Sequence, residues 1–515
     1  MQQKNEQSLI WLYAWALAML AICYQGYRFN SGDQAEHLPQ VYRLLDPELF
    51  GGDFFLSLYD QTFTVREYWV WLVYGLSTLV GVKAACFALH VICLWLISYS
   101  WIQIGRHLTG SFAAGVAGTF LSLTLLNSFT VGGNNLAGSL FIGSMPAEAL
   151  ASLGVLLYIK DKQRFAFVVL GIATWFQALV GLQWCILLCL TKIAQLNRTH
   201  IRQALLYGLL YLLAASPMLV PVLIRQFYSN TSYDKELYYR LLFVNRNMLH
   251  YLPSLFPLTD YIKATLLAIL AAIFIKTGRA FMLKTGKYWM LIIIFGCIVY
   301  SVLLMELQVM AVGKLQWFKT TVWLNVCSSM AIASALVQWK QFNEQWITGI
   351  WAQKAVAVLG VAGLLFIFAS GYLPSARLNN RYQLWANPAT DLQLMHSWIA
   401  QHLPKDALVL VPPDDDAFAC EAKRPTPVNF KAVVHEPFYF MAWKKSMEDY
   451  YQVDFTTLTK QSALPAAIAN YRSSRPAPEV NKARYRLDDT GNCDFLLQLG
   501  PRIHQQGKWI LTEIK

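Results

Sequence analysis

Charged residues are scarce in this sequence: they make up 14% of its 515 residues, whereas a soluble globular protein has about 25%. The deficit is concentrated before residue 375, where long apolar runs alternate with short basic loops. This scarcity excludes an ordinary soluble enzyme and favours an integral membrane protein. Because the net charge of +12 comes from these short loops and not from one basic face, we expect no nucleic acid as a partner.

Several catalytic and structural signatures are also absent. The sequence has no Gly-rich P-loop, no Gly-x-Ser-x-Gly elbow and no His/Cys set with zinc spacing. Its halves lack the paired broken helices of inverted-repeat transporters. The first apolar run, Leu9 to Tyr27, lacks an Ala-x-Ala cleavage site, so we interpret it as a retained helix. Cys420 and Cys493 lie in the polar C-terminal region and could form one disulfide or stay as two thiols.

What the sequence does contain is a series of apolar runs of membrane-spanning character. A helix needs about 20 mostly apolar residues to cross a bilayer. We predict about 11 transmembrane helices: 9–27, 84–104, 112–128, 138–159, 165–177, 178–194, 204–224, 260–276, 288–306, 317–338 and 355–373. The two short runs within 165–194 could also be a single crossing or a re-entrant pair.

The segment 66–82 decides the topology. It is apolar but opens with Arg66 and Glu67 and is rich in Trp and Tyr, which favour the membrane interface. If it lies flat on the outer surface, the basic loops fall on one side, as the positive-inside rule requires. This places the N-terminus inside and the C-terminus outside. We expect a multi-pass protein of a bacterial cytoplasmic membrane, surrounded by membrane lipids.

The predicted organisation is a transmembrane domain, residues 1–374, followed by a soluble extracytoplasmic α/β domain, residues 375–515. The first contains two large outer loops, 28–83 and 225–259. In the second, helical spacing over 390–403 precedes a buried strand at 407–411, and 495–499 and 509–514 are interpreted as closing strands. A helix followed by a buried strand indicates at least partly parallel pairing.

An acidic cluster in the first outer loop is the leading candidate for chemistry. Glu36 lies three residues and His37 four residues after Asp33, so the three side chains share a face if the loop turns helical. Ionisable groups beside a bilayer are costly and tend to be functional. A carboxylate here could act as a general base, or the group could contribute to a divalent metal site. The alternative is a capping box, in which Asp33 and Glu36 only begin a helix.

Further candidates lie nearer the other outer segments. Arg246, His250 and Tyr251 belong to the second outer loop, where an arginine could bind phosphate or anchor the chain at the interface. Lys319 and Lys314 could bind a phosphate as point charges, or extend to the headgroups. Glu148 and Glu306 are further possible site residues. The triplet 414–416, three aspartates after Pro-Pro, is interpreted as a solvated turn.

Together these features resemble the GT-C superfamily of membrane glycosyltransferases: one helix, a long outer loop with an early acidic residue, surface helices, a helix bundle and a soluble outer domain. The resemblance is clearest over residues 9–128. Within the superfamily, the chain is most similar to an uncharacterised group of bacterial polytopic membrane proteins with an Arg-x-Pro-His-His-Tyr run. Arg246, His250 and Tyr251 match that run, whereas Met248 and Leu249 depart from it.

The resemblance implies a GT-C-like fold and transfer of a sugar from a polyprenyl-phosphate donor to a glycan, lipid or protein acceptor, inverting the anomeric centre. It places Asp33 at the catalytic position, supported by Glu36 or His37, and a donor phosphate near Lys319 and Arg246. No cofactor is certain, although a divalent metal is possible. The competing hypotheses are a transporter or flippase of lipid-linked substrates, and a non-catalytic envelope assembly factor.

Overall fold

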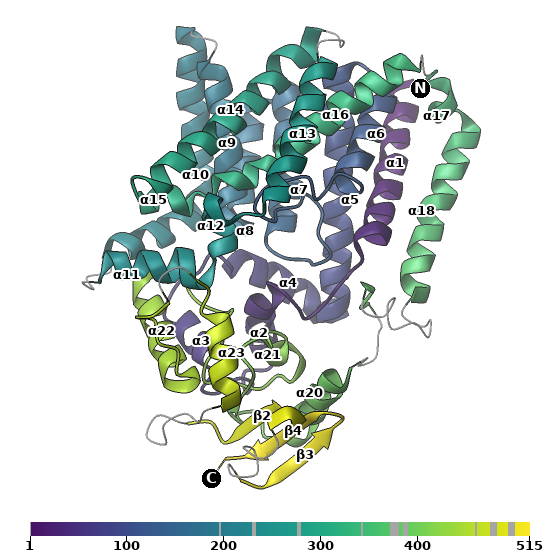
Figure 1. Ribbon diagram of the computed structural model, residues 1–515. Helices are drawn as coiled ribbons and strands as arrows, with labels where there is room; N and C mark the ends of the chain where they lie inside the picture. The colour runs from purple at the N-terminus through teal and green to yellow at the C-terminus, as the bar shows by residue number, and fades with distance from the viewer. Residues whose placement is uncertain are drawn as a thin grey trace. The chain divides into compact units, whose positions relative to one another are not determined.

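The computed structural model is mainly helical, with one small sheet near the C-terminus (Figure 1). It describes residues 2–514 except 195–196, 229–232, 276–279, 341–342, 371–380, 385–389, 459–460, 474–481 and 493–499. The chain divides into two compact units. The first, the helical unit, comprises Met1–Tyr27, Cys86–Val220 and Leu249–Ser370; the second, the mixed unit, comprises Arg28–Ala85, Pro221–Met248 and Gly371–Lys515. The predicted class, a polytopic α-helical membrane protein with a C-terminal α/β region, is confirmed.

Each of the eleven predicted crossings overlaps a helix, but 124–128 and 138–143, which were predicted as parts of crossings, are not helical. Within the described part of the chain, seven helices are long and apolar enough to span a membrane: α1 (Gln2–Gln25), α5 (Val82–Thr109), α10 (Arg198–Tyr228), α13 (Leu258–Ile275), α14 (Ala280–Met305), α16 (Thr321–Trp339) and α18 (Ile350–Ser370). Four are shorter apolar helices: α6 (Phe112–Leu123), α7 (Ser144–Ile159), α8 (Gln163–Phe176) and α9 (Ala178–Ile193). Short elements of this unit are α12 (Met248–Tyr251), η2 (Pro253–Leu255), α15 (Met310–Lys314), η3 (Trp317–Thr320) and α17 (Gln345–Thr348).

Two local breaks explain how the apolar runs divide. Gly81 separates α4 (Glu67–Val80) from α5. Its φ of +81° is a backbone conformation that glycine adopts without the steric cost that other residues have. Gln177 is extended, and its side chain accepts a hydrogen bond from the Leu179 amide at 3.0 Å. The run 165–194 is therefore two helices rather than one.

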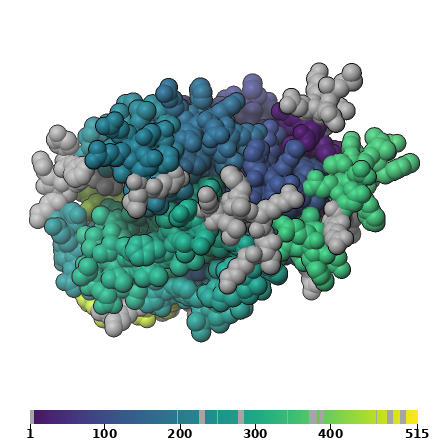
Figure 2. Space-filling model, turned by 90° about the horizontal axis from the view of Figure 1, so that it is seen from above, coloured from purple at the N-terminus to yellow at the C-terminus, as the bar shows by residue number. Residues whose placement is uncertain are grey.

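Close packing holds the helical unit together. α7 packs against α8 and α9, α1 lies along α18, and α16 contacts α6, α13 and α14. In Figure 2 the blue atoms of the 100–200 region adjoin the teal-green atoms of the later helices. A Cβ atom placed on Gly118 of α6 would lie 2.4 Å from the Met330 sulfur and 2.9 Å from its Cα. Because real Cβ contacts are never that short, glycine is required where α6 crosses α16.

The mixed unit combines short helices with a four-stranded sheet. Its helices are α2 (Gln34–Leu45), α3 (Phe54–Tyr59), α4, α11 (Lys235–Tyr239), the π-helix η1 (Arg240–Arg246), α20 (Asp391–His402), α21 (Phe418–Glu421), α22 (Pro437–Tyr451), α23 (Leu464–Ser473) and η4 (Thr490–Asn492). The strands are β1 (Val409–Leu410), β2 (Tyr485–Asp489), β3 (Arg502–Gln506) and β4 (Trp509–Glu513).

The strand order is β1-β2-β4-β3, with β1 parallel to β2 and the other pairs antiparallel. Partly parallel pairing was therefore predicted correctly, whereas β2 and β3 were not predicted. The expected strand at 495–499 lies outside the described residues. α20 packs against β3 and β4 (Figure 1), and Met395 and Ile399 on that helix join a core that includes Leu487 of β2.

Three distant stretches of sequence build the mixed unit. Asp53, the N-cap of α3, accepts hydrogen bonds from the Leu56 amide at 3.0 Å and the Thr426 amide at 2.9 Å. Asn245 in η1 donates to the Leu458 carbonyl at 2.8 Å. Thr426 and Leu458 thus tie the C-terminal part of this unit both to residues 28–85 and to residues 221–248. The predicted boundary near residue 375 stays a prediction, since this unit also includes 28–85 and 221–248.

Candidate functional site

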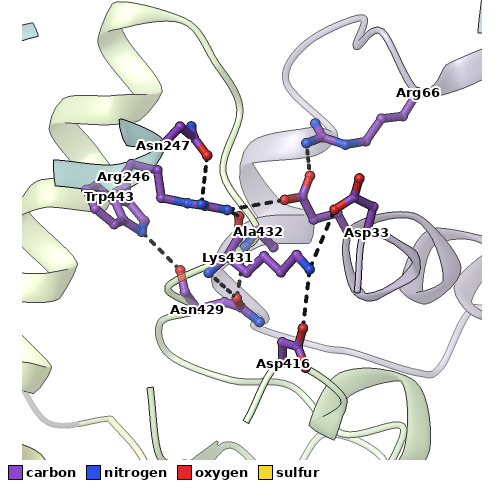
Figure 3. A network of polar contacts seen from close by, with 10 residues as sticks. Asp33, Arg66, Arg246, Asn247, Asp416, Asn429, Lys431, Ala432 and Trp443 are labelled. Carbon is purple, nitrogen blue, oxygen red and sulfur yellow. Dashed lines mark hydrogen bonds and ion pairs between the residues drawn. The ribbon is translucent and has the colours of Figure 1, made fainter. Parts of the chain in front are cut away.

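Asp33 begins α2, but its side chain makes no capping hydrogen bond to that helix. The carboxylate is 58% exposed, and its Oδ1 lies 3.5 Å from the Lys431 ammonium nitrogen. Figure 3 shows Lys431 extending between Asp33 and Asp416, whose Oδ2 is 3.3 Å from the same nitrogen. The capping alternative therefore does not describe Asp33, which presents an accessible carboxylate next to a cation.

Glu36 lies one turn further along α2 and is almost completely buried. Arg66, just before α4, pairs with one of its oxygens, and the Arg246 Nη2 donates to the other at 3.4 Å (Figure 3). Both guanidinium groups are about nine-tenths buried. A buried carboxylate between two arginines ties together three segments, and its oxygens are not presented to solvent.

His37 faces a different neighbour on the same helix. Its ring lies 4.9 Å from the Trp69 ring of α4, and its Nδ1 atom is buried without a hydrogen-bond partner among the described residues. Burial, followed by the positive charge of Arg66, lowers the pKa of His37 to about 3. The imidazole is therefore neutral at physiological pH and can accept or relay a proton only as a weak base.

A short loop, 429–432, positions Lys431. The Asn429 side-chain oxygen accepts hydrogen bonds from the backbone amides of Lys431 at 2.8 Å and Ala432 at 2.9 Å. The Trp443 indole of α22 donates to the Asn429 carbonyl at 3.0 Å (Figure 3). Arg246 also donates to the Lys431 carbonyl, and its guanidinium lies over the Phe430 ring at 5.2 Å. The loop is thus fixed from both ends.

Arg246 itself comes from the π-helix η1, an element that often occurs at functional sites. Its Nη1 donates a hydrogen bond to the Asn247 side chain at 2.9 Å, while Nη2 donates to the Glu36 carboxylate and to the Lys431 carbonyl. In this structure Arg246 therefore clamps three segments of the mixed unit. The phosphate-binding role of Arg246 stays a prediction.

The interpretation of the aspartate triplet 414–416 as a solvated turn is wrong for its middle member, Asp415. The side chain of Asp415 is only 4% exposed, and its Oδ2 lies 2.9 Å from Nε2 of His396 on α20. The other imidazole nitrogen lies 2.8 Å from Oε2 of Glu421. Burial alone would lower the pKa of His396, but the two carboxylates outweigh it and raise the pKa to about 9. The turn that presents Asp416 is thereby anchored.

The remaining predicted residues belong to the helical unit. Glu148 on α7 is buried and accepts a hydrogen bond from the Trp323 indole at 3.1 Å. Lys319 in η3 is half-buried and within electrostatic reach of Glu148, and Lys314 ends α15. Glu306 is exposed just after α14.

In the second predicted motif, His250 is exposed and Tyr251 is buried. The Tyr251 carbonyl accepts a hydrogen bond from the Tyr300 hydroxyl at 3.0 Å. These roles stay predictions. Among the described residues, no group of three or more His, Cys, Asp or Glu side chains is placed to hold a metal ion.

Cys420 is buried in α21, and its sulfur lies 3.6 Å from the Gln34 carbonyl. Cys493 lies outside the described residues, so a disulfide between them stays a prediction.

Sequence reasoning missed most of the cationic side of the cluster. Lys431, Asn429 and Trp443 carry no local motif, and Arg66 was considered only for topology. The Asp-Asp-Asp triplet was the one available signal for Asp416. The lysine reaches Asp33 across almost 400 residues of sequence, a separation that no periodicity or spacing rule covers.

Comparisons with known proteins give a family match and matches among solved structures. Residues 390–450 match a family described as a domain of unknown function (DUF6798), which covers too little of the chain to assign it as a whole. No curated protein matches. Among solved structures, ArnT from Cupriavidus metallidurans in the apo state matches with a TM-score of 0.47 and 12% identity, covering 99% of this chain and 98% of that one. This similarity is too low to carry donor, acceptor or mechanism, so we base the function on the residues of this chain.

Proposed function

We propose that this protein is a membrane glycosyltransferase of the GT-C type, which moves a sugar from a polyprenyl-phosphate donor to an acceptor hydroxyl, with Asp33 as the general base. The observation that supports this most directly is the accessible Asp33 carboxylate, placed 3.5 Å from the Lys431 ammonium. A base must reach its proton, and the exposure of Asp33 allows this. The acceptor hydroxyl would belong to a glycan, a lipid or a protein on the extracytoplasmic side.

The chemistry would be a single displacement. Asp33 takes the proton of the acceptor hydroxyl while that oxygen forms a bond to the anomeric carbon. The bond between the anomeric carbon and the phosphate oxygen breaks, and its electron pair leaves with the polyprenyl phosphate. The proton on Asp33 then passes to water. Because phosphate is a good leaving group, cations near its oxygens suffice and no strong general acid is required.

The other members of the cluster would position Asp33. Glu36 holds Arg66 and Arg246 together at the first turn of α2, directly after Asp33. A rigid first turn fixes the direction of the Asp33 side chain, and fixed geometry is a large part of catalysis. We therefore assign Glu36 a positioning role, and His37, neutral and packed on Trp69, a place beside the bound sugar.

A cellular experiment tests the proposal before the sugar is identified. In a strain lacking the protein, mass spectrometry of the lipid fraction should reveal an accumulated polyprenyl-phosphate-linked sugar. The wild-type protein should clear it, and Asp33→Asn, expressed to the same level, should not. The matched control is Asp60→Asn, another half-exposed aspartate of the same loop, paired with Arg43. Clearance by Asp33→Asn equal to that of the control would refute the role of Asp33.

A further inference from the structure

We propose that Lys431, carried by the segment that matches the domain of unknown function, is a latch on Asp33: it pairs with this carboxylate in the resting protein and leaves it for an anionic phosphate group of the substrate. The inference rests on the proposed function and deepens it, since it assigns the phosphate contact to a residue from the C-terminal part of the chain. It also gives the segment 390–450 a role, namely to complete the site that begins at α2.

The position of the ammonium group is the first argument. Its nitrogen lies 3.5 Å from Asp33 and 3.3 Å from Asp416, both longer than the 2.7–2.9 Å of a strong charge-assisted hydrogen bond. The lysine is 24% exposed, whereas the two carboxylates are 58% and 36% exposed. A cation shared loosely between two accessible carboxylates can exchange one of them for another anion at little cost.

The fixed backbone beneath the lysine is the second argument. Asn429, Trp443 and Arg246 hold the loop by hydrogen bonds to side chains and carbonyls. A lysine that served only as a surface ion pair would not need this support. Because the loop is fixed and the side chain is long, the ammonium group can move by rotation about its own bonds while the loop stays in place.

The acidic turn supplies the third argument. His396 binds Asp415 and Glu421 on its two ring nitrogens, so the turn that carries Asp416 is anchored in the core of the mixed unit. Asp416 thus remains as a partner of Lys431 after Asp33 is released. In this arrangement Asp416 and Asp33 both compete with a phosphate for the same ammonium group.

Competition gives a signature that a merely structural lysine would not produce. We would measure binding of farnesyl phosphate, with farnesol as the uncharged reference, to the full-length protein in nanodiscs. Lys431→Met should weaken binding of the phosphate by about tenfold or more, since a charged hydrogen bond is lost, and should leave farnesol unchanged. Lys431→Arg should restore most of the affinity. Asp416→Asn and Asp33→Asn should each tighten phosphate binding severalfold, because a competing carboxylate is gone.

The matched control is Lys445→Met, an exposed lysine on α22 in the same matched segment, which should bind like the wild type. Equal phosphate affinity for Lys431→Met and Lys445→Met in folded protein would overturn the latch. So would unchanged or weaker binding in both aspartate variants. If the binding pattern holds but Asp33→Asn still clears the lipid-linked sugar in cells, the proposed function fails and the phosphate contact at Lys431 stands.

Discussion

The buried imidazole of His396 should make the stability of the mixed unit depend on pH in a predictable window. The raised pKa, about 9 in the folded protein against about 6.5 when unfolded, means that the folded state holds a proton more tightly. Its stabilising contribution is therefore complete below about pH 6.5 and is lost as the pH rises through about 9. The difference corresponds to about 3 kcal/mol of unfolding free energy.

The assay is thermal unfolding of the full-length protein in detergent between pH 6 and pH 10, followed by intrinsic fluorescence. The apparent midpoint temperature of the wild type should fall by a few degrees as the pH rises from 7 to 9.5. His396→Gln should start lower and lose less over the same range, because it has no imidazole to titrate. His402→Gln, on the exposed end of the same helix, is the control and should follow wild type. An identical pH dependence for wild type and His396→Gln would refute the reasoning.

Two further substitutions test the packing and the ion network. Glu36→Gln leaves Arg66 and Arg246 buried without their carboxylate, and breaking a buried pair costs about 3–5 kcal/mol. Chemical denaturation should therefore show a large decrease in the free energy of unfolding. A variant as stable as wild type would contradict the ion network in Figure 3. Gly118→Ile forces α6 away from Met330 of α16 and should cost more than about 3 kcal/mol by overpacking. Its melting temperature should fall well below that of Gly208→Ile, since a Cβ atom placed on Gly208 meets no atom within 4 Å.

The helices were predictable because each apolar run is itself the physical cause of the element. A run of membrane-spanning length must satisfy its backbone hydrogen bonds internally, and so it becomes a helix. The break near Gly81 was visible as a change from an aromatic segment to an apolar one, whereas the sequence left open whether the run 165–194 is broken at Gln177. The sequence carries no such signal for the two missed strands, β2 and β3. Arg486 and Asp488 of β2 are buried as an ion pair at 3.0 Å. Because charged residues are not expected in a buried strand, the sequence pattern did not indicate one there.

The acidic side of the candidate site was predictable, and of its cations Arg246 was predicted as a phosphate-binding residue. Asp33, Glu36 and His37 are neighbours in sequence, so their spacing on a helix could be worked out. Their separate environments could not, since Lys431 and the partners of Glu36 come from distant segments. Spacing placed the three residues together as one catalytic group, whereas the structure gives each a different neighbour.

The most direct test of the central claim is single-turnover transfer by the purified protein in nanodiscs. The donor would be the polyprenyl-phosphate-linked sugar that accumulates in the deletion strain. Our account predicts that wild type releases free polyprenyl phosphate, that Asp60→Asn does the same, and that Asp33→Asn binds the donor but leaves it intact. Movement of the donor across the bilayer without cleavage, or equal cleavage by Asp33→Asn, would contradict it.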